Sequence, residues 1–269
     1  MKLFNKKTLL YFILFGAILY TCIMTFLYFN QEQFYFHPKI LASDYQYEFE
    51  MPFEEYDIKV DENNTLNTLL FKSESSKGVI LYLHGNAGAL HDWGLRAPLY
   101  TNNNHDILFV DYRGYGKNKN SIENEDMLHK DMQAVYDFLK TKYDEKDITV
   151  LGFSIGTGLA TKLAANNNPK QLILEAPYYS FETLVNKIAP LVPSFLINYK
   201  IKTNEFLTRV NCPITIFHGT EDQLITPTEN AIPLSKIKPN ISLHLIKNCG
   251  HNGIYINTEY HAKLKVLLH

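Results

Sequence analysis

The stretch Gly152-Phe153-Ser154-Ile155-Gly156 has the form G-x-S-x-G and decides how the rest of this 269-residue chain is interpreted. It follows the apolar run 148–151 and precedes residues 158–164, which have the composition of a helix. This arrangement predicts a serine on a sharp strand-to-helix turn, where a strained backbone exposes the hydroxyl. Small residues are needed at both ends because a side chain there would collide with the neighbouring strand or helix. An ordinary glycine-flanked turn is the alternative, so the chemistry depends on what the rest of the chain supplies.

Composition and charge narrow the classes of function. A hydrophobic content of 46% is typical of a globular protein, and the length suits one α/β domain with a full core. The formal net charge of −2 gives no reason to expect a nucleic-acid partner. The three cysteines, Cys22, Cys212 and Cys249, form no metal-binding pattern, and free thiols are favoured over a disulfide between the last two. We therefore expect no metal and no cofactor.

The amino-terminal stretch Leu9–Phe29 carries no charge and is long enough to cross the roughly 30 Å hydrocarbon core of a membrane. Three lysines precede it, Lys2, Lys6 and Lys7, whereas the flank that follows holds only Lys39. Because positive flanks stay on the cytoplasmic side, we expect a single-pass signal-anchor with a cytoplasmic N-terminus and the rest of the chain outside the cytoplasm. A cleaved signal peptide, a lipid-attachment site within the stretch and a buried core helix are the alternatives.

The remainder of the chain alternates between predicted strands and helices. The expected strands are residues 56–60, 66–71, 78–83, 105–110, 148–151, 172–174, 214–217 and 241–246, and the expected helices are 122–141, the segment after Ser154, and 258–268. The first two strands are expected to pair in antiparallel fashion across a four-residue turn. The alternation that follows predicts a mostly parallel central sheet with helices on both faces.

The predicted domain organisation has three parts. Residues 1–30 form the cytoplasmic tip and transmembrane anchor, residues 31–52 form a stalk, and residues 53–269 form the α/β domain. Residues 181–209 are apolar, contain two prolines and are too long for an ordinary loop between strand and helix. We interpret this insertion as a short helical cap over the carboxyl edge of the sheet, where open α/β folds bind ligands. A helix on the flank of the sheet is the alternative.

A serine hydroxyl is a weak nucleophile at neutral pH, so Ser154 requires a base, and the base requires a carboxylate that orients it. The expected chain order is serine, acid, histidine. After Ser154 the only aspartate is Asp222, which follows the predicted strand 214–217. Its neighbour Glu221 is the alternative, although two adjacent side chains rarely both point inward. We therefore predict Asp222 as the acid.

Three histidines are candidates for the base. His251 lies between glycines in a loop that follows the predicted strand 241–246, and such a loop can reach the carboxyl edge of the sheet. His244 lies inside that strand, and His261 lies inside the last predicted helix. These positions favour His251.

The tetrahedral intermediate also needs donors for its oxyanion. We predict the backbone N–H of Ile155 as one donor, because it follows the nucleophile. The second donor is expected in the glycine-containing loop after strand 78–83, at Asn86, with Ala87 as the alternative. His84 in the same loop is interpreted as a structural residue.

Taken together, these motifs resemble the α/β-hydrolase superfamily. The stretches that carry the resemblance are His84-Gly-Asn-Ala-Gly88, Asp111-Tyr-Arg-Gly-Tyr-Gly116, Gly152-Phe-Ser-Ile-Gly156, His218-Gly-Thr-Glu-Asp222 and Gly250-His251. The chain is similar in particular to membrane-anchored, single-domain serine hydrolases of the serine aminopeptidase-like subgroup, which Gln33-Phe-Tyr-Phe-His37-Pro38 also suggests. The resemblance implies an α/β-hydrolase fold, the triad Ser154, Asp222 and His251, and a structural turn at residues 111–116 that lines the pocket.

The leading functional hypothesis is a serine hydrolase that cleaves a carboxylic ester or thioester through an acyl-enzyme intermediate. The apolar cap and the anchor suggest a small-molecule or lipid-like acyl substrate. A serine peptidase or aminopeptidase is one alternative, for which Glu175 could bind a free N-terminus, and an acyltransferase is another. A non-catalytic binding protein on the same fold is the hypothesis from a different class.

Overall fold

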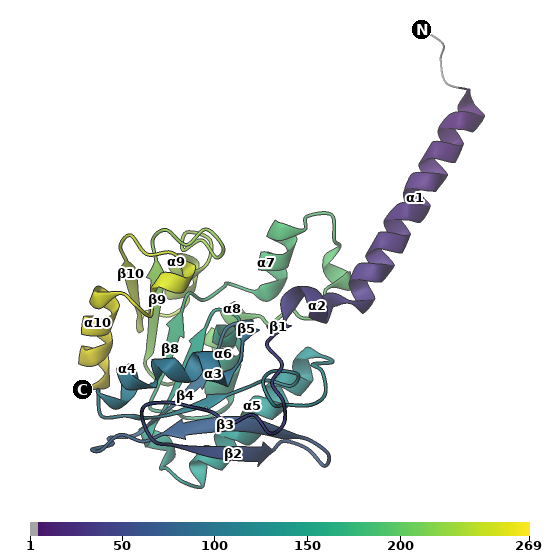
Figure 1. The fold of residues 1–269 in the computed structure, drawn as a ribbon. Helices are drawn as coiled ribbons and strands as arrows, with labels where there is room; N and C mark the ends of the chain where they lie inside the picture. Colours follow the sequence, from purple (N-terminus) through teal and green to yellow (C-terminus); the bar gives the residue numbers. More distant parts are fainter. Residues whose placement is uncertain (1–4) are drawn as a thin grey trace.

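A twisted sheet forms the centre of the fold in the computed structural model, which describes residues 5–269 (Figure 1). Within these residues it has eight strands in the order β10-β9-β8-β7-β4-β6-β3-β2. The strands are β2 (Phe53–Lys59), β3 (Thr65–Phe71), β4 (Val79–Leu83), β6 (Asp106–Val110), β7 (Ile148–Phe153), β8 (Gln171–Glu175), β9 (Ile214–Gly219) and β10 (Ile241–Ile246). β2 and β3 form the predicted antiparallel pair, β3 joins β6 in antiparallel fashion, and the other neighbours are parallel.

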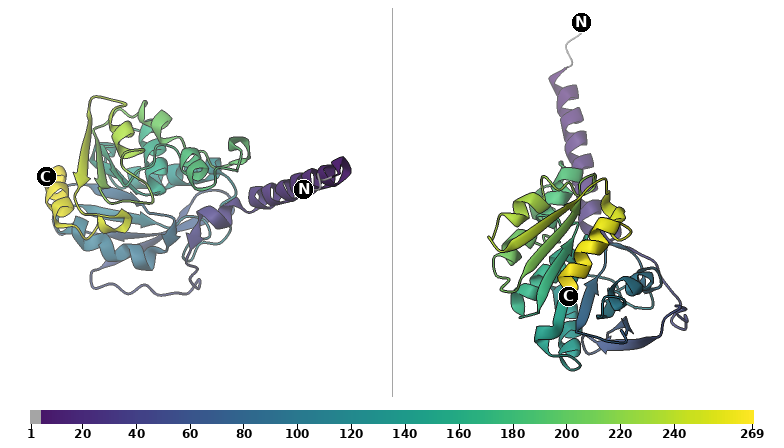
Figure 2. Two further views of the ribbon diagram at one scale, coloured as in Figure 1. Left: turned by 90° about the horizontal axis from the view of Figure 1, so that it is seen from above. Right: turned by 90° about the vertical axis from the view of Figure 1, so that its left-hand side faces the viewer.

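Helices cover both faces of the sheet, as predicted (Figure 2). One face packs against α5 (Glu125–Lys140), α6 (Gly156–Asn166), α8 (Thr203–Leu207) and α9 (Ala231–Ser235). The other face packs against α3 (Leu90–Trp93), α4 (Ala97–Thr101) and α10 (Thr258–Leu268). Every residue of β4, β6, β7 and β8 is buried, which is why these strands are continuous apolar runs rather than alternating ones.

The sequence of α5 shows why the longer helices were predictable. The Asn124 side chain caps its first turn by accepting a hydrogen bond from the Met127 N–H. Its apolar residues recur at spacings of four, three and four and are all buried against the sheet: Leu128, Met132, Val135 and Leu139. The helices α3, α4 and α9, by contrast, are too short to show a helical period, and the sequence did not predict them.

Parallel register brings the loops that carry chemistry to one edge of the sheet. Leu83 of β4 lies beside Gly152 of β7, and Phe153 of β7 lies beside Glu175 of β8. The carboxyl ends of β4, β7, β8, β9 and β10 therefore open toward the same side. The loops that leave these ends hold the predicted site residues.

The amino-terminal helix α1 (Lys6–Phe29) projects away from the domain (Figure 1). Its length and composition would allow it to cross a membrane, and 6% of its most apolar window is buried in the protein. Lys6 and Lys7 precede that window, whereas Lys2 lies outside the described residues.

The segment predicted as a stalk packs against the domain instead of standing apart from it. It contains the short helix α2 (Gln31–Tyr35) and the two-residue strand β1 (His37–Pro38), which pairs with β5 (Ala87–Gly88). Phe36 and Tyr47 are buried in the two apolar cores of the domain. Residues 31–52 are therefore part of the architecture of the α/β domain.

The predicted cap region divides into two parts. The helix α7 (Phe181–Ile188) and the 3-10 turn η3 (Ser194–Leu196) lie over the carboxyl edge of the sheet, close to the end of α1 (Figure 1). The helix α8 packs against α6 in the helical layer, so residues 203–207 resemble the flank-helix alternative. The part that covers the edge is thus shorter than the predicted 181–209.

Candidate active site

Ser154 lies on the sharp turn between β7 and α6, with a backbone φ of +52°. A positive φ is unfavourable for a residue with a side chain, and here the surroundings hold it in place: the Ser154 N–H donates to the Glu175 carbonyl at 2.9 Å. A methyl group on Gly152 would lie 2.5 Å from the Gly156 carbonyl oxygen, so glycine is required for this close approach. The strained turn predicted from the pentapeptide is present.

The structure brings the three predicted triad side chains together from three separate loops. His251 Nε2 lies 3.0 Å from Ser154 Oγ, and His251 Nδ1 lies 2.7 Å from Asp222 Oδ2. Asp222 follows β9, and His251 begins a 3-10 turn after β10. This is the connectivity that a serine, a base and an orienting carboxylate require for nucleophilic catalysis.

Asp222 is held in place by contacts on both of its oxygens. Oδ1 accepts the N–H groups of Leu224 at 3.0 Å and Ile225 at 2.8 Å. Oδ2 receives His251 and also lies 3.2 Å from His218 Nε2. Burial raises the pKa of Asp222, but the hydrogen bonds from His218 and His251 outweigh it and hold the pKa well below its usual range. The carboxylate therefore stays ionised at neutral pH.

His218 is a residue of this site that the sequence reading did not identify. It is fully buried at the end of β9, and its Nε2 lies 2.6 Å from the Ile225 carbonyl as well as near Asp222. The four-residue spacing between His218 and Asp222 was visible in the sequence. That spacing alone does not reveal that the strand end and the following loop fold back on each other.

The alternative candidates for the acid and for the base do not take part in this series of hydrogen bonds. Glu221 is exposed to solvent beside the buried Asp222, as alternation of direction predicts. His244 stacks on Phe217 in the sheet, and His261 lies 2.5 Å from the Tyr255 carbonyl.

The two residues predicted to supply the oxyanion donors lie at the pocket that holds Ser154. Asn86 and Ile155 both line it, and in residues 5–269 neither backbone N–H donates to a protein acceptor. The Asn86 carbonyl accepts hydrogen bonds from the Tyr115 hydroxyl and the His37 N–H, each at 2.8 Å, which fix the loop. Such free, fixed donors can stabilise an oxyanion. The alternative, Ala87, lies in β5 and does not line the pocket.

The polar side chains of His84 and Arg113, near these loops, are bound within the protein. His84 is buried, stacks on Trp93 and lies 3.4 Å from Asp111 Oδ1. Arg113 is bound by Asp131 through two hydrogen bonds of 2.7 Å. None of these side chains lines the pocket, and neither does any residue of 111–116, so the expectation that this turn lines the pocket is wrong.

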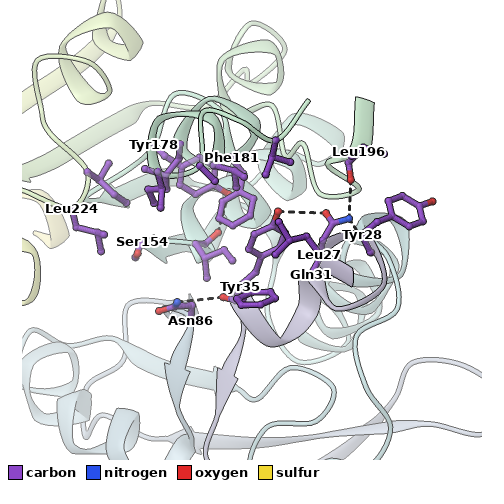
Figure 3. A pocket seen from close by; sticks show the side chains of 18 of the residues that line it. Leu27, Tyr28, Gln31, Tyr35, Asn86, Ser154, Tyr178, Phe181, Leu196 and Leu224 are labelled. Carbon is purple, nitrogen blue, oxygen red and sulfur yellow. Dashed lines mark hydrogen bonds between the residues drawn. The ribbon is translucent and has the colours of Figure 1, made fainter. Parts of the chain in front are cut away.

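A cavity of about 330 Å³ extends from Ser154 between the cap and the amino-terminal helices. Figure 3 shows Ser154 on one side of it and Leu27, Tyr28 and Gln31 on the other. The remaining lining is mostly apolar and includes Met24, Phe34, Tyr35, Tyr178, Phe181, Leu184, Val185, Ile188, Val192, Leu196, Leu224 and Ile225. Among the described residues, no charged side chain lines the cavity.

Glu175, which the peptidase alternative required near the pocket, is buried at the end of β8 against α10. It accepts a hydrogen bond from the Tyr260 hydroxyl and lies near Tyr82, whose hydroxyl receives Arg96 at 2.7 Å. Burial raises the pKa of Glu175 despite these partners. It does not line the cavity and is not placed to bind a substrate amine there.

The described residues contain no group of three or more His, Cys, Asp or Glu side chains arranged to hold a metal ion. Cys212 and Cys249 are separate free thiols, as the favoured interpretation predicted.

Known proteins resemble this chain both in sequence and in fold. Residues 78–206 match a family profile described as the alpha/beta hydrolase fold. The chain is 27% identical to Protein bem46 of Schizosaccharomyces pombe over 79% of its own length and 75% of that protein. It is 29% identical to the lysophosphatidylserine lipase ABHD12 of Danio rerio over 56% of its length, and spans 45% of that lipase. A Pyrococcus furiosus esterase, Pf2001, has a similar fold, with a TM-score of 0.67 at 18% identity over 87% of this chain and 97% of that one.

Proposed function

Since this chain belongs to the α/β-hydrolase superfamily, we propose that it is a serine hydrolase that cleaves a carboxylic ester or thioester through an acyl-enzyme intermediate. The observation that carries the proposal is the hydrogen-bonded series from Asp222 through His251 to Ser154. Asn86 and Ile155, which line the same pocket as Ser154 and whose N–H groups have no protein acceptor in residues 5–269, support the second requirement of acyl transfer.

In the proposed reaction, Ser154 Oγ attacks the acyl carbon while His251 Nε2 takes its proton. Asp222 keeps the imidazole oriented and stabilises the imidazolium that forms, because its carboxylate remains ionised. The N–H groups of Asn86 and Ile155 donate to the oxyanion of the tetrahedral intermediate. His251 then protonates the leaving alcohol or thiol, and a water activated by the same nitrogen releases the acid and restores Ser154. No cofactor is needed for these steps.

The shape and polarity of the cavity support an acyl chain as the recognised group. An uncharged lining stabilises methylene groups by removing them from water, by about 0.8 kcal/mol each. The names of the lysophosphatidylserine lipase and of the esterase among the relatives are consistent with small or lipid-like ester substrates. A peptidase that binds a free N-terminus would require an acidic group in the pocket, and none lines it among the described residues. An acyltransferase would use the same residues, and it is distinguished by whether product acid or a new ester accumulates.

We further propose that α1 is a signal-anchor with its N-terminus in the cytoplasm and the hydrolase domain on the other side. The basic Lys6 and Lys7 at the start of α1 support this orientation. A tag at the C-terminus that external protease removes from intact cells or spheroplasts would agree with it. Protection of that tag until the membrane is broken would reverse the orientation.

A fluorophosphonate probe tests the nucleophile directly, because it reacts with activated serines. We expect the detergent-solubilised full-length protein to be labelled, and Ser154→Ala to lose labelling completely. Ser235→Ala is the matched control, since Ser235 lies on α9 and bonds the Ile232 carbonyl away from the cavity. Persistent labelling of Ser154→Ala would mean that another serine is the nucleophile. An unlabelled wild-type protein would favour the non-catalytic binding hypothesis.

A further inference from the structure

One face of the amino-terminal helix packs against the cap. Tyr20, Met24 and Leu27 recur at spacings of four and three, which places them on one side of α1, and Gln31 is the first residue of the next helix, α2. Met24 is 9% exposed and Gln31 is 4% exposed, although almost all of α1 is otherwise open. This face meets the residues after α7, so the helix touches the domain along a line and not only at its end.

The contact reaches far up the helix. The Tyr20 hydroxyl donates to the Leu191 carbonyl at 2.9 Å. Tyr20 lies nine residues before Phe29, the last residue of α1, so the two are separated by about 14 Å along the helix at about 1.5 Å per residue. That is about half of a hydrocarbon core roughly 30 Å thick. If α1 spans a membrane, Leu191 lies well inside one leaflet.

The same hydrogen bond satisfies two polar groups that would lack a partner in a lipid environment. A tyrosine hydroxyl in the middle of a membrane-spanning helix and a carbonyl outside any helix both need a partner in the absence of water. Tyr20 and Leu191 satisfy each other. In water, either group could be solvated and the contact would be dispensable.

Residues 188–196, here named the cap tip, have the composition of a lipid-facing segment. Their sequence, Ile188-Ala-Pro-Leu-Val-Pro-Ser-Phe-Leu196, contains no charge. Three large side chains on it are open: Ile188 is 67% exposed, Leu191 77% and Phe195 78%. An exposed apolar patch of this kind, next to an apolar helix, marks an interaction surface. The nearest lysine, Lys187, is paired with Glu229 on the side of the domain.

The cavity connects this surface to the proposed nucleophile. Its walls include Met24, Leu27 and Tyr28 from α1, and Ile188 and Leu196 from the cap tip, while Ser154 lies across from Leu27 and Tyr28 (Figure 3). With a volume of about 330 Å³ and a mostly apolar lining, the cavity has room for an acyl chain.

We propose that the cap tip is embedded beside α1 in the hydrocarbon layer of a membrane, and that the cavity between them opens sideways into that leaflet. A single acyl chain then slides from the bilayer to Ser154 without crossing water. The substrate class is a membrane-dissolved amphiphile whose ester lies near the interface. The entry route rests on the proposed hydrolase function, whereas the embedding of the cap tip does not.

The depth of the cap tip can be measured without any activity. In full-length Cys22→Ala protein in phosphatidylcholine nanodiscs, the remaining thiols, Cys212 and Cys249, are buried, so a fluorophore on Phe195→Cys reports its own surroundings. We expect quenching by lipids that carry a spin label on the acyl chain, and protection from aqueous iodide. The same fluorophore on Val266→Cys, which is equally exposed at 78% on α10, should show the reverse. Iodide quenching at position 195 equal to that at position 266 would overturn the embedding.

The entry route is tested by Leu191→Asp, since Leu191 is exposed and does not line the cavity. We expect a loss of at least tenfold in turnover of a long single-chain ester dissolved in phosphatidylcholine vesicles, with turnover of a soluble short-chain ester within twofold of wild type. Ile256→Asp, at a residue that is 74% exposed and does not line the cavity, should change neither. An unchanged rate on the vesicle substrate, or an equal loss on both substrates, would overturn the lateral route. If wild-type protein cleaved no ester while position 195 remained embedded, the hydrolase proposal would fail and the embedding would stand.

Discussion

The two sides of the cavity are held in place by different kinds of interaction. On the side of the sheet, Ser154, His251 and Asp222 are held by a continuous set of directional hydrogen bonds within loops fixed by parallel strands. On the opposite side, segments 24–35 and 181–197 meet mainly through apolar contacts, with Gln31 and Glu32 as polar attachments. The comparison teaches that reactivity and selectivity can be changed separately. Substitutions on the sheet side should alter the rate for every substrate, and those on the helical side should alter which substrates are used.

The largest effect should come from Asp222→Asn on the sheet side. The amide keeps the shape but no longer stabilises the imidazolium or selects the right tautomer of His251, so kcat should fall by about 10⁴ for short and long esters alike. Steady-state kinetics with two chain lengths measure this. A loss confined to one chain length would break the proposed division between the two sides.

A smaller and selective effect is expected from Gln31→Leu on the helical side. Gln31 donates to the Leu196 carbonyl at 2.8 Å and accepts from the Asn198 N–H at 2.9 Å, and both partners would lose this bond. Each buried group left unsatisfied costs about 1–3 kcal/mol, which should loosen α2 from the cap. We expect kcat/KM for long-chain esters to drop about tenfold, with short-chain esters within twofold.

The matched control for this substitution is Gln46→Leu. Gln46 is exposed and bonds only the nearby Asp44 carbonyl, so neither rate should change. Equal losses on short and long esters in Gln31→Leu would indicate that α2 also positions the catalytic loops.

Filling the cavity should also reduce turnover of long-chain esters more than that of short-chain esters. Leu184→Trp on α7 would displace space for about two methylenes, worth about 1.6 kcal/mol at about 0.8 kcal/mol each. The expected result is a shift of the preferred acyl chain to shorter lengths, with roughly a tenfold loss for the longest chain. Leu95→Trp, 64% exposed and outside the cavity, is the control. An unchanged chain-length profile would mean that the acyl chain lies elsewhere.

The smallest effect concerns stability and compares two carboxylates near the same edge. Burial raises the pKa of Glu175, so its protonated form stabilises the folded state fully below about pH 4.3, the unfolded value, and this contribution is lost as pH rises through the folded pKa. Glu175→Gln should therefore flatten the decline of unfolding free energy with rising pH, by at most about 1.4 kcal/mol per pH unit. Urea denaturation between pH 4 and 7 measures the slope, and equal slopes in both proteins would refute the assignment.

The pKa of Asp222 is shifted in the opposite direction to that of Glu175, so its effect on stability depends on pH in the opposite way. Its pKa is lowered, so its contribution to stability is fully present above about pH 3.9, the unfolded value, and is lost as pH falls through the folded pKa. The stability of wild-type protein should thus retain the contribution of Asp222 throughout the range in which that of Glu175 declines.

The sequence predicted the sheet side of the cavity because each of its residues is attached to a strand end. A strand is recognisable from a local run of apolar residues, and parallel register then brings the loops after β4, β7, β9 and β10 to one edge. The order of Ser154, Asp222 and His251 along the chain sufficed to place them together. His218 was missed because its contact with Asp222 depends on how the loop after β9 folds back.

The helical side could not be predicted in the same way. Tyr20 and Gln31 bond residues of the cap more than 160 positions later, and no local period encodes such a contact. Residues 31–52 read as a stalk because they are short, mixed in polarity and without a strong pattern. Their packing on the domain follows from long-range burial of Phe36 and Tyr47, which only the folded structure makes visible.

The most direct test of the central claim is to trap the acyl-enzyme. Full-length protein mixed with a short activated ester, quenched in acid within the first turnover and digested, should yield one peptide heavier by the mass of the acyl group. The account predicts that this group is on Ser154 and that Ser154→Ala yields no modified peptide. An acyl group on any other residue, or turnover of the ester with undiminished rate by Ser154→Ala, would contradict it.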